Sequence, residues 1–213
     1  MLKYCILILL NLALIINCIA CSPTSENSQN FDITSAKDNW KVFQGEDVAI
    51  SLPQNFEGGN PTNTKELKKI SEKLNSLPCI TSKTTEKLEQ NVKGILLMAF
   101  LPKCDSNNLS IGVNIIKEEI SNEETLDKYL ENEINNLKEK YKIIEKRIFD
   151  INQESIASIL AEIQLENITM KQLFYIINKE DEFWIITYSI KADKFEENLS
   201  IFEDSIKTIQ FLN

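Results

Sequence analysis

The second half of the chain contains four strand-like segments in succession, and this run limits the fold more than any other feature. The segments are Ile143 to Phe149, Ser158 to Leu165, Met170 to Asn178 and Glu182 to Ile190. The last contains the run FWIITY, whose aromatic and β-branched residues favour a pleated sheet. The connections at 166–169 and 179–181 are short, so the simplest topology is a four-stranded meander.

Further strands are predicted in the first half. The predicted strands cover Trp40 to Phe43, Val48 to Leu52 after a turn at Gln44 to Asp47, Gly94 to Leu101, and Leu109 to Ile115 after a loop at Lys103 to Asn108. The Gly94 to Leu101 segment is apolar throughout and ends at Pro102, which predicts a central strand covered on both faces. Leu109 to Ile115 alternates apolar and polar residues, which is the period of a half-buried strand.

Three helices are predicted from capping pairs followed by apolar stripes. The pairs are Asn63 with Glu66, Ser121 with Glu124, and Asp193 with Glu196. The stripes behind them are Leu67, Ile70 and Leu74; Leu126, Leu130, Ile134, Leu137 and Tyr141; and Phe195, Leu199, Phe202 and Ile206. Each stripe has helical spacing and is interpreted as core. The sequence therefore predicts a mixed α/β domain at residues 38–213.

The N-terminus has the pattern of a bacterial lipoprotein signal peptide. Lys3 precedes an almost wholly apolar run from Tyr4 to Ala20, which is short for a membrane span. The segment from Cys18 to Ser22 resembles the bacterial lipobox, with Cys18 at a position where Leu, Val or Ile is usual. The prediction is cleavage after Ala20 and lipidation of Cys21. A retained anchor and an ordinary secreted protein are the alternatives.

Residues 21–37 are predicted to be a lipidated tether, because residues 22–37 are rich in Ser, Thr and Asn and poor in large apolar groups. Two or three acyl chains hold such a protein stably on a membrane. The predicted location is the cell envelope, facing the periplasm or the exterior. Ser22, where a retention signal more often has Asp, favours the outer membrane if the host has one.

Charge disfavours nucleic acid as a partner. The whole chain has 23 basic and 32 acidic residues, and loss of Lys3 with the signal peptide takes the net charge from −9 to −10. Such a surface is repelled by phosphate backbones.

Two cysteines remain in the predicted domain once Cys5, Cys18 and Cys21 are set aside. Cys79 and Cys104 each follow a Leu-Pro pair that marks the end of an element. In an oxidising compartment the two can form a disulfide, and they can equally remain separate buried thiols.

The composition excludes several kinds of chemistry. The chain contains no His, so Ser-His-Asp triads, Cys-His pairs and His-ligated metals are absent. Its five glycines fit neither a P-loop nor a dinucleotide-binding motif. Paired acids occur at Glu118-Glu119, Glu123-Glu124 and Glu180-Asp181-Glu182, but they lack the regular spacing of a calcium loop and are interpreted as solvated surface. No catalytic, metal or cofactor residue is assigned.

The element order resembles that of the PsbP-like and DcrB-like lipoproteins over residues 38–212. The resemblance rests on Ile50 to Pro53, on the mid-chain helix, and on a C-terminal pattern of Phe183 to Tyr188, Phe195 to Glu197, Phe202, Ser205 and Phe211. It implies an α/β/α sandwich with a mainly antiparallel central sheet and helices on both faces. It also implies non-enzymatic binding or assembly at a membrane. Because the chain lacks His, a metal site built on imidazole in that family does not transfer.

Two functions follow as hypotheses. The first is a membrane-tethered, non-enzymatic binding or assembly module with a protein partner. The second is a carboxylate- or Tyr-based hydrolase, or a small-ligand carrier, in the cell envelope.

Overall fold

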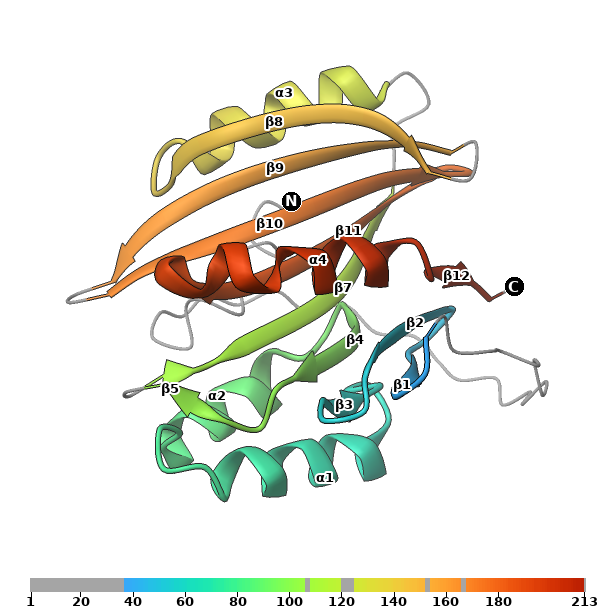
Figure 1. The fold of residues 1–213 in the computed structure, drawn as a ribbon. Helices are drawn as coiled ribbons and strands as arrows, with labels where there is room; N and C mark the ends of the chain where they lie inside the picture. Colours follow the sequence, from blue (N-terminus) through green and yellow to red (C-terminus); the bar gives the residue numbers. More distant parts are fainter. Residues whose placement is uncertain (1–36, 106–107, 120–124, 152–153, 166–167, 213) are drawn as a thin grey trace.

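A seven-stranded antiparallel sheet forms the centre of the molecule (Figure 1). The computed structural model describes residues 37–105, 108–119, 125–151, 154–165 and 168–212. The spatial order of the strands is β3-β4-β7-β11-β10-β9-β8. Their bounds are β3 Glu57–Gly59, β4 Ile95–Phe100, β7 Ile111–Glu119, β8 Lys142–Ile151, β9 Glu154–Leu165, β10 Ile168–Lys179 and β11 Glu182–Lys191.

The predicted meander is confirmed, because β8, β9, β10 and β11 are neighbours in sequence order. Lys179 pairs with Glu182, so Glu180 and Asp181 form a two-residue turn. Glu180 has φ of 57°, the left-handed conformation that such turns require. The other predicted connection was too long, because Ile168 and Thr169 already pair with β9.

Alternation along each strand divides the core between the two faces of the sheet. In β10, Leu173, Tyr175 and Ile177 contribute to the core on one face, while Phe174 and Ile176 contribute to the core on the other. All five side chains are buried. The sheet is therefore covered on both sides, as predicted for the sandwich class.

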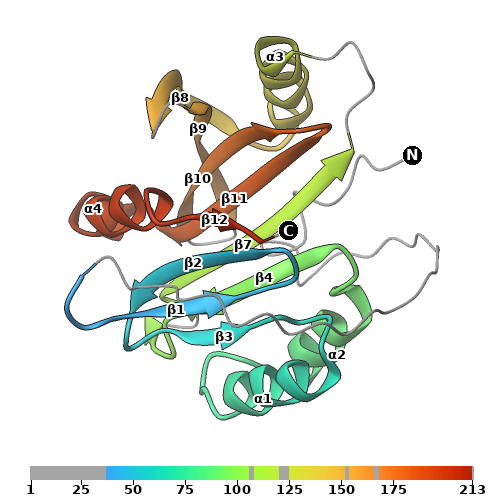
Figure 2. The same ribbon diagram turned by 90° about the vertical axis from the view of Figure 1, so that its right-hand side faces the viewer.

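Three helices cover one face: α1 Thr64–Asn75, α2 Ser82–Asn91 and α3 Leu126–Leu137 (Figures 1 and 2). The sequence prediction missed α2, whose only buried side chains are Thr85 and Leu88. Its N-cap is Thr81, which accepts a hydrogen bond from the Thr84 backbone. A stripe this narrow is too weak to identify a helix by periodicity.

The opposite face is covered by helix α4, Phe195–Ile206, and by a small sheet of order β1-β2-β12. The small sheet contains β1 Trp40–Gln44, β2 Val48–Pro53 and β12 Gln210–Phe211. Figure 2 shows α4 beside the C-terminal strands, with β2 next to it and β1 on the far side of β2. The first and last described strands thus lie in one small sheet over the main sheet.

Several local predictions need correction. Strand β4 is buried along its whole length but lies next to the edge strand β3, and β11 is the middle strand. The loop predicted at Lys103 to Asn108 includes a short pair, β5 Cys104–Asp105 with β6 Asn108–Leu109. Its two strands are only two residues long, so no alternation marks them.

The helix starts also differ from prediction. Asn63 does cap α1, but the Glu66 carboxylate accepts from the Asn60 backbone instead of closing the predicted capping box. Asp193 does not cap α4: a 3-10 turn, Ala192–Lys194, leads into that helix, and Lys194 stands at its N-cap without a side-chain bond. For α3 the cap is Thr125, while Ser121 and Glu124 lie outside the described residues. Tyr141 follows the end of α3 but is buried in the same core.

Within the described ranges, no helix is both long and apolar enough to cross a membrane. The predicted signal peptide, Cys21 and the tether up to residue 36 lie outside those ranges.

Candidate functional site

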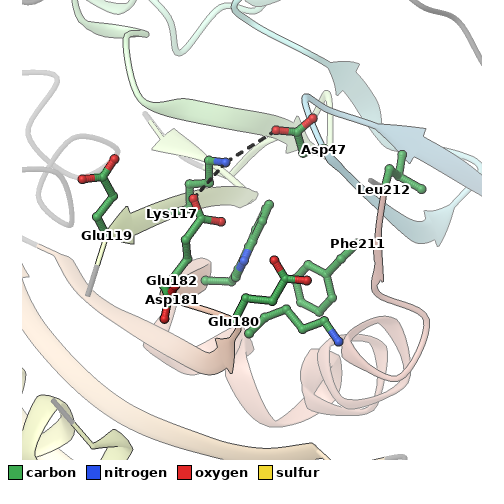
Figure 3. Close-up of a pocket in the computed structure, with 10 residues that line it drawn as sticks. Asp47, Lys117, Glu119, Glu180, Asp181, Glu182, Phe211 and Leu212 are labelled. Carbon is green, nitrogen blue, oxygen red and sulfur yellow. Dashed lines mark hydrogen bonds and ion pairs between the residues drawn. The ribbon is translucent and has the colours of Figure 1, made fainter. Parts of the chain in front are cut away.

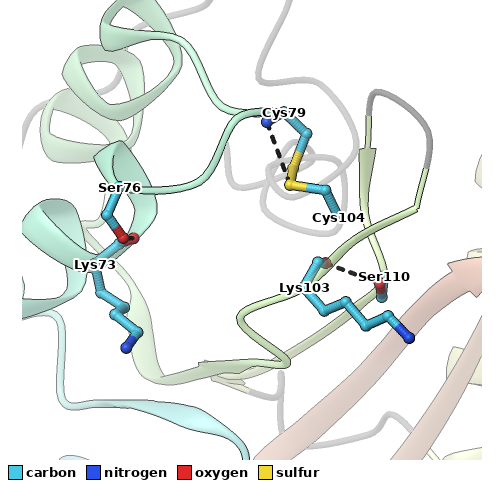
Figure 4. The surroundings of a disulfide bond; sticks show 6 residues. All are labelled: Lys73, Ser76, Cys79, Lys103, Cys104 and Ser110. Carbon is cyan, nitrogen blue, oxygen red and sulfur yellow. Dashed lines mark hydrogen bonds between the residues drawn. A yellow bond between two sulfur atoms is a disulfide. The ribbon is translucent and has the colours of Figure 1, made fainter.

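Cys79 and Cys104 form a disulfide, with Cα atoms 5.8 Å apart (Figure 4). Cys79 lies in the connection between α1 and α2, and Cys104 begins β5. The backbone N–H of Cys79 also donates to the Cys104 sulfur at 3.2 Å. The bond therefore ties the helical connection to the hairpin that precedes β7, and it has a structural role.

The acidic pairs from the sequence are partly brought together. Glu119 pairs across the sheet with Glu182, next to the turn formed by Glu180 and Asp181. Glu118 instead accepts a hydrogen bond from the Tyr129 hydroxyl at 2.7 Å. Glu123 and Glu124 lie outside the described residues. Among the described side chains, no group of three or more acids or cysteines is arranged to hold a metal ion.

Glu119, Glu180, Asp181 and Glu182 line a surface cleft of about 620 Å³ at one end of β7 and β11, here called the Lys117 cleft (Figure 3). The Lys117 ammonium lies 3.1 Å from Glu182 and 3.5 Å from Asp47. It also lies 5.4 Å from the centre of the Trp184 ring, within cation-π range. Lys117 thereby links β7, β11 and the turn between β1 and β2.

The Lys117 cleft is acidic, because Asp47, Glu119, Glu180, Asp181 and Glu182 line it with only Lys117 and Lys179 as bases. Partial burial lowers the pKa of Lys117, but its bonds to Glu182 and Asp47 outweigh that effect, and the net pKa is raised. The ammonium therefore stays charged and pairs with two of these acids, Asp47 and Glu182. The buried Trp184 indole N–H has no hydrogen-bond partner in the described part of the chain.

A second and larger cleft, about 750 Å³, lies between α4 and the β8–β10 part of the sheet. It is here called the α4 cleft. It forms because α4 packs mainly against β2 and β11, while β8 and β9 extend beyond the helix (Figure 1). Side chains on the α4 side of the sheet line it, and one face of the helix closes it.

The floor of the α4 cleft is apolar. Its apolar and aromatic lining residues are Ile148, Phe149, Ile151, Leu160, Leu173, Tyr175, Phe195, Leu199 and Ile206. Tyr175 contacts Phe149 edge-to-face, with ring centres 6.2 Å apart. Burial raises the pKa of Tyr175, and the nearby Glu203 adds to this effect. The hydroxyl therefore remains a neutral hydrogen-bonding group at neutral pH.

The rim of the α4 cleft is charged. Four acids and two bases line it: Glu145, Asp150, Glu196 and Glu203, with Arg147 and Lys207. The Arg147 guanidinium lies 2.6 Å from Glu145, and Glu145 raises its pKa. An apolar floor with a few polar groups at its edge, within 300–1,000 Å³, is the usual form of a binding cleft.

Sequence reasoning did not find the α4 cleft. The apolar positions of β8, β10 and α4 were correctly assigned to the core, but the cleft depends on where α4 crosses the sheet. No signal within one segment marks it, because its lining residues come from β8, β9, β10 and α4 and meet only in the folded chain.

The fold and the cleft together define a mixed α+β domain with an open cleft beside α4. More particularly, the fold is PsbP-like. It is similar to the solution structure of cyanobacterial PsbP (CyanoP) from Synechocystis sp. PCC 6803, with a TM-score of 0.52. The likeness covers 86% of this chain and 98% of that chain at 10% sequence identity, and it shows the fold alone.

Two weaker likenesses carry no argument about function. LpqN of Mycobacterium tuberculosis, described as involved in cell envelope biogenesis, has a TM-score of 0.48, 9% identity, and coverage of 84% of this chain and 89% of its own. The Ran-binding protein Mog1p of Saccharomyces cerevisiae has a TM-score of 0.48, 8% identity, and coverage of 82% and 97% respectively. No family model and no curated protein matches the sequence significantly.

Proposed function

We propose that this protein is a membrane-tethered, non-enzymatic lipoprotein of the cell envelope that binds a protein partner through the α4 cleft. The observation that carries the proposal is the cleft itself, whose half-buried apolar residues Phe149, Ile151, Leu160 and Leu199 lie between α4 and β8–β10. Apolar surface of this kind is stabilised when a partner covers it. The signal-peptide pattern and Cys21 support export and anchoring.

A protein partner suits the α4 cleft because the cleft has apolar residues on its floor and charges of both signs on its rim. Apolar anchors in a groove with polar groups around them are the usual composition of a protein interface. The Lys117 cleft is a poorer site, since its own ammonium already satisfies Asp47 and Glu182.

Site-specific photocrosslinking tests the binding role. A photoreactive residue replaces Leu199, which lines the α4 cleft, in the full-length chain in its native membrane. We expect one dominant protein adduct. The adduct should be lost in Glu203→Arg, which inverts a rim charge, and retained in Glu197→Arg, the matched change on α4 outside the cleft. Equal capture by a probe at Lys69 on α1 would reject the α4 cleft as the site.

A small-ligand carrier is the second candidate, because about 750 Å³ also suits a small molecule. It predicts that native mass spectrometry of the purified protein finds a bound small molecule that Leu199→Trp displaces. In that case the photoprobe at Leu199 captures no protein.

The proposed anchor has its own test. The intact mass of protein extracted from membranes should equal residues 21–213 with a diacylglyceryl unit and, in some hosts, a third acyl chain. The mass of the unmodified full-length chain would instead identify residues 1–20 as a retained anchor, and both the lipoprotein proposal and the outer-membrane location would be withdrawn.

A further inference from the structure

Strand β8 is an edge of the main sheet whose outer side pairs with no strand of the described residues, and it is unusually exposed. It lies at the end of the strand order, and seven of its ten residues are exposed. The two exposed large hydrophobic side chains of the described residues are Ile144 and Ile148, with 40% and 44% of their surface accessible, and both belong to β8. An exposed edge of this kind is a template for another strand.

We propose that β8 pairs antiparallel with β8 of a second copy of this chain, about a twofold axis through Lys146. The proposal goes beyond the proposed function, because it concerns pairing of the sheet edge with a second copy, although Glu145, Arg147 and Ile148 also line the α4 cleft. Its basis is that the sequence of β8 is complementary to itself in one register.

In an antiparallel pair, outward-pointing backbone groups alternate along each strand, so an edge that pairs with its own copy must be centred on a residue. Centring on Lys146 places Ile144 opposite Ile148, and Glu145 opposite Arg147, in both halves of the pair. A centre at Glu145 would oppose Ile144 to Lys146, and a centre at Arg147 would oppose Ile144 to Asp150. Of these three registers, only the one centred on Lys146 places isoleucine opposite isoleucine and glutamate opposite arginine.

The ion pair already present in β8 fits this arrangement. Arg147 and Glu145 lie on the same side of the strand, 2.6 Å apart. In the paired register each would also face its opposite charge in the other copy, which forms a four-membered charge network. Such cross-strand pairs of opposite charge and of β-branched residues stabilise a sheet.

Two features of β8 oppose the pairing and keep it weak. Lys146 faces its own copy on the axis, and the register with β9 shifts between Ile143 and Glu145. Edge lysines and bulges both suppress edge-to-edge association. The self-association is therefore expected to be specific in register but modest in affinity, and anchoring in one membrane raises the local concentration of the partner copy.

The position of Lys37 is compatible with this pairing on a membrane. Lys37, the first described residue, forms an ion pair with Asp204 of α4. A twofold axis perpendicular to the sheet leaves both copies of α4 on the same face. Both tethers would then leave from one face, as two copies anchored in one membrane require.

Cysteine crosslinking in membranes tests the register. Under mild oxidation of the full-length chain, Lys146→Cys should give at least about tenfold more disulfide-linked dimer than Ile144→Cys, Ile148→Cys or the control Lys69→Cys on α1, because only the residue on the axis faces itself. Coexpressed Ile144→Cys and Ile148→Cys chains should crosslink to each other. Lys146→Cys dimer no more abundant than that of Lys69→Cys would overturn the proposal.

A charge exchange supplies a second and independent test. In the Lys146→Cys background, Arg147→Glu should reduce the dimer by about tenfold, because it places like charges opposite each other. Adding Glu145→Arg restores the opposite-charge pairs and should recover the dimer to within about twofold. Loss without recovery, in chains that circular dichroism shows to be folded, would reject the register. Photocrosslinking at Leu199 reports on the α4 cleft separately, so the two proposals can fail independently.

Discussion

The hydroxyl groups of Tyr188 and Ser205 lie 2.6 Å apart in the core, where the middle strand of the sheet meets helix α4. The Tyr188 ring also stacks on Phe202 with centres 4.7 Å apart. This contact holds α4 in the position that leaves the α4 cleft open.

Tyr188→Phe removes that hydrogen bond but keeps the stacked ring. Ser205 retains its bond to the Phe202 carbonyl at 3.0 Å, so no hydroxyl is left without a partner. We expect the free energy of unfolding to fall by about 1 kcal/mol, the usual net value of one hydrogen bond. Urea denaturation measures it. A loss above about 4 kcal/mol would mean that the ring itself had moved, as in a cavity-forming substitution.

Tyr141→Phe should have the opposite effect. The buried Tyr141 hydroxyl has no hydrogen-bond partner in the described part of the chain, and its ring packs edge-to-face on Phe174 at 6.4 Å. The phenyl ring keeps that packing and removes an unsatisfied polar atom. We expect stabilisation by about 1 kcal/mol in the same urea assay. A destabilised Tyr141→Phe variant would reveal a partner for the hydroxyl.

Stability should fall at alkaline pH. Burial raises the pKa of Tyr141 from 10.0 to about 12, and it also raises the pKa of Tyr175 and Tyr188. Raised folded-state pKa values mean that the unfolded chain loses these protons first, so their contribution is complete below pH 10 and decreases above it. The expected slope is about 1.4 kcal/mol per pH unit for each tyrosine. Urea titrations from pH 9 to pH 12 test this, and Tyr141→Phe should reduce the slope between pH 10 and 12.

Removal of the disulfide should be costly. The bond between Cys79 and Cys104 spans 25 residues, and a link of that length stabilises by roughly 3–4 kcal/mol through restriction of the unfolded chain. We expect the Cys79→Ser, Cys104→Ser double variant to lose about that amount in urea denaturation. Reduction followed by alkylation should raise the intact mass by the two alkyl groups added to the two freed thiols. Full alkylation of both cysteines without reduction would show that the bond is absent from the exported protein.

Two glycines offer a matched pair of substitutions. A Cβ atom on Gly45 would lie 2.3 Å from the Leu96 carbonyl oxygen, whereas one on Gly112 would meet nothing within 4 Å. Gly45→Ala should therefore destabilise by about 1–3 kcal/mol because β4 has to shift. Gly112→Ala should change stability by less than about 1 kcal/mol. Thermal unfolding of both variants tests the close approach of the β1–β2 turn to β4.

The sheet was predictable where alternation was long, and the helices where an apolar stripe was wide. Leu173 and Tyr175 alternate with Phe174 and Ile176, and that period is imposed by the two-sided core. Helix α2 was missed because its buried face contains only Thr85 and Leu88. The apolar periodicity of a segment is therefore clear only where the element buries a wide face.

The small sheet and the clefts depend on contacts between distant parts of the chain. Phe211 pairs with Val48 in β12 and β2, and its ring lies 4.8 Å from that of Trp184. No periodicity within either segment specifies this pairing. The α4 cleft likewise depends on where one helix crosses the sheet, and the Lys117 cleft on a turn that meets two strands.

The ion pair between Lys37 and Asp204 fixes the point where the tether of the proposed lipoprotein joins the domain, and so sets how far the domain can lie from the membrane. Sixteen peptide steps separate Cys21 from Lys37, and a fully extended chain of that length reaches about 55 Å. A domain confined to a half-sphere of that radius searches its surroundings at an effective concentration in the millimolar range. A partner that binds weakly in dilute solution can then be held for most of the time, provided that it extends no farther from the membrane than this short chain allows.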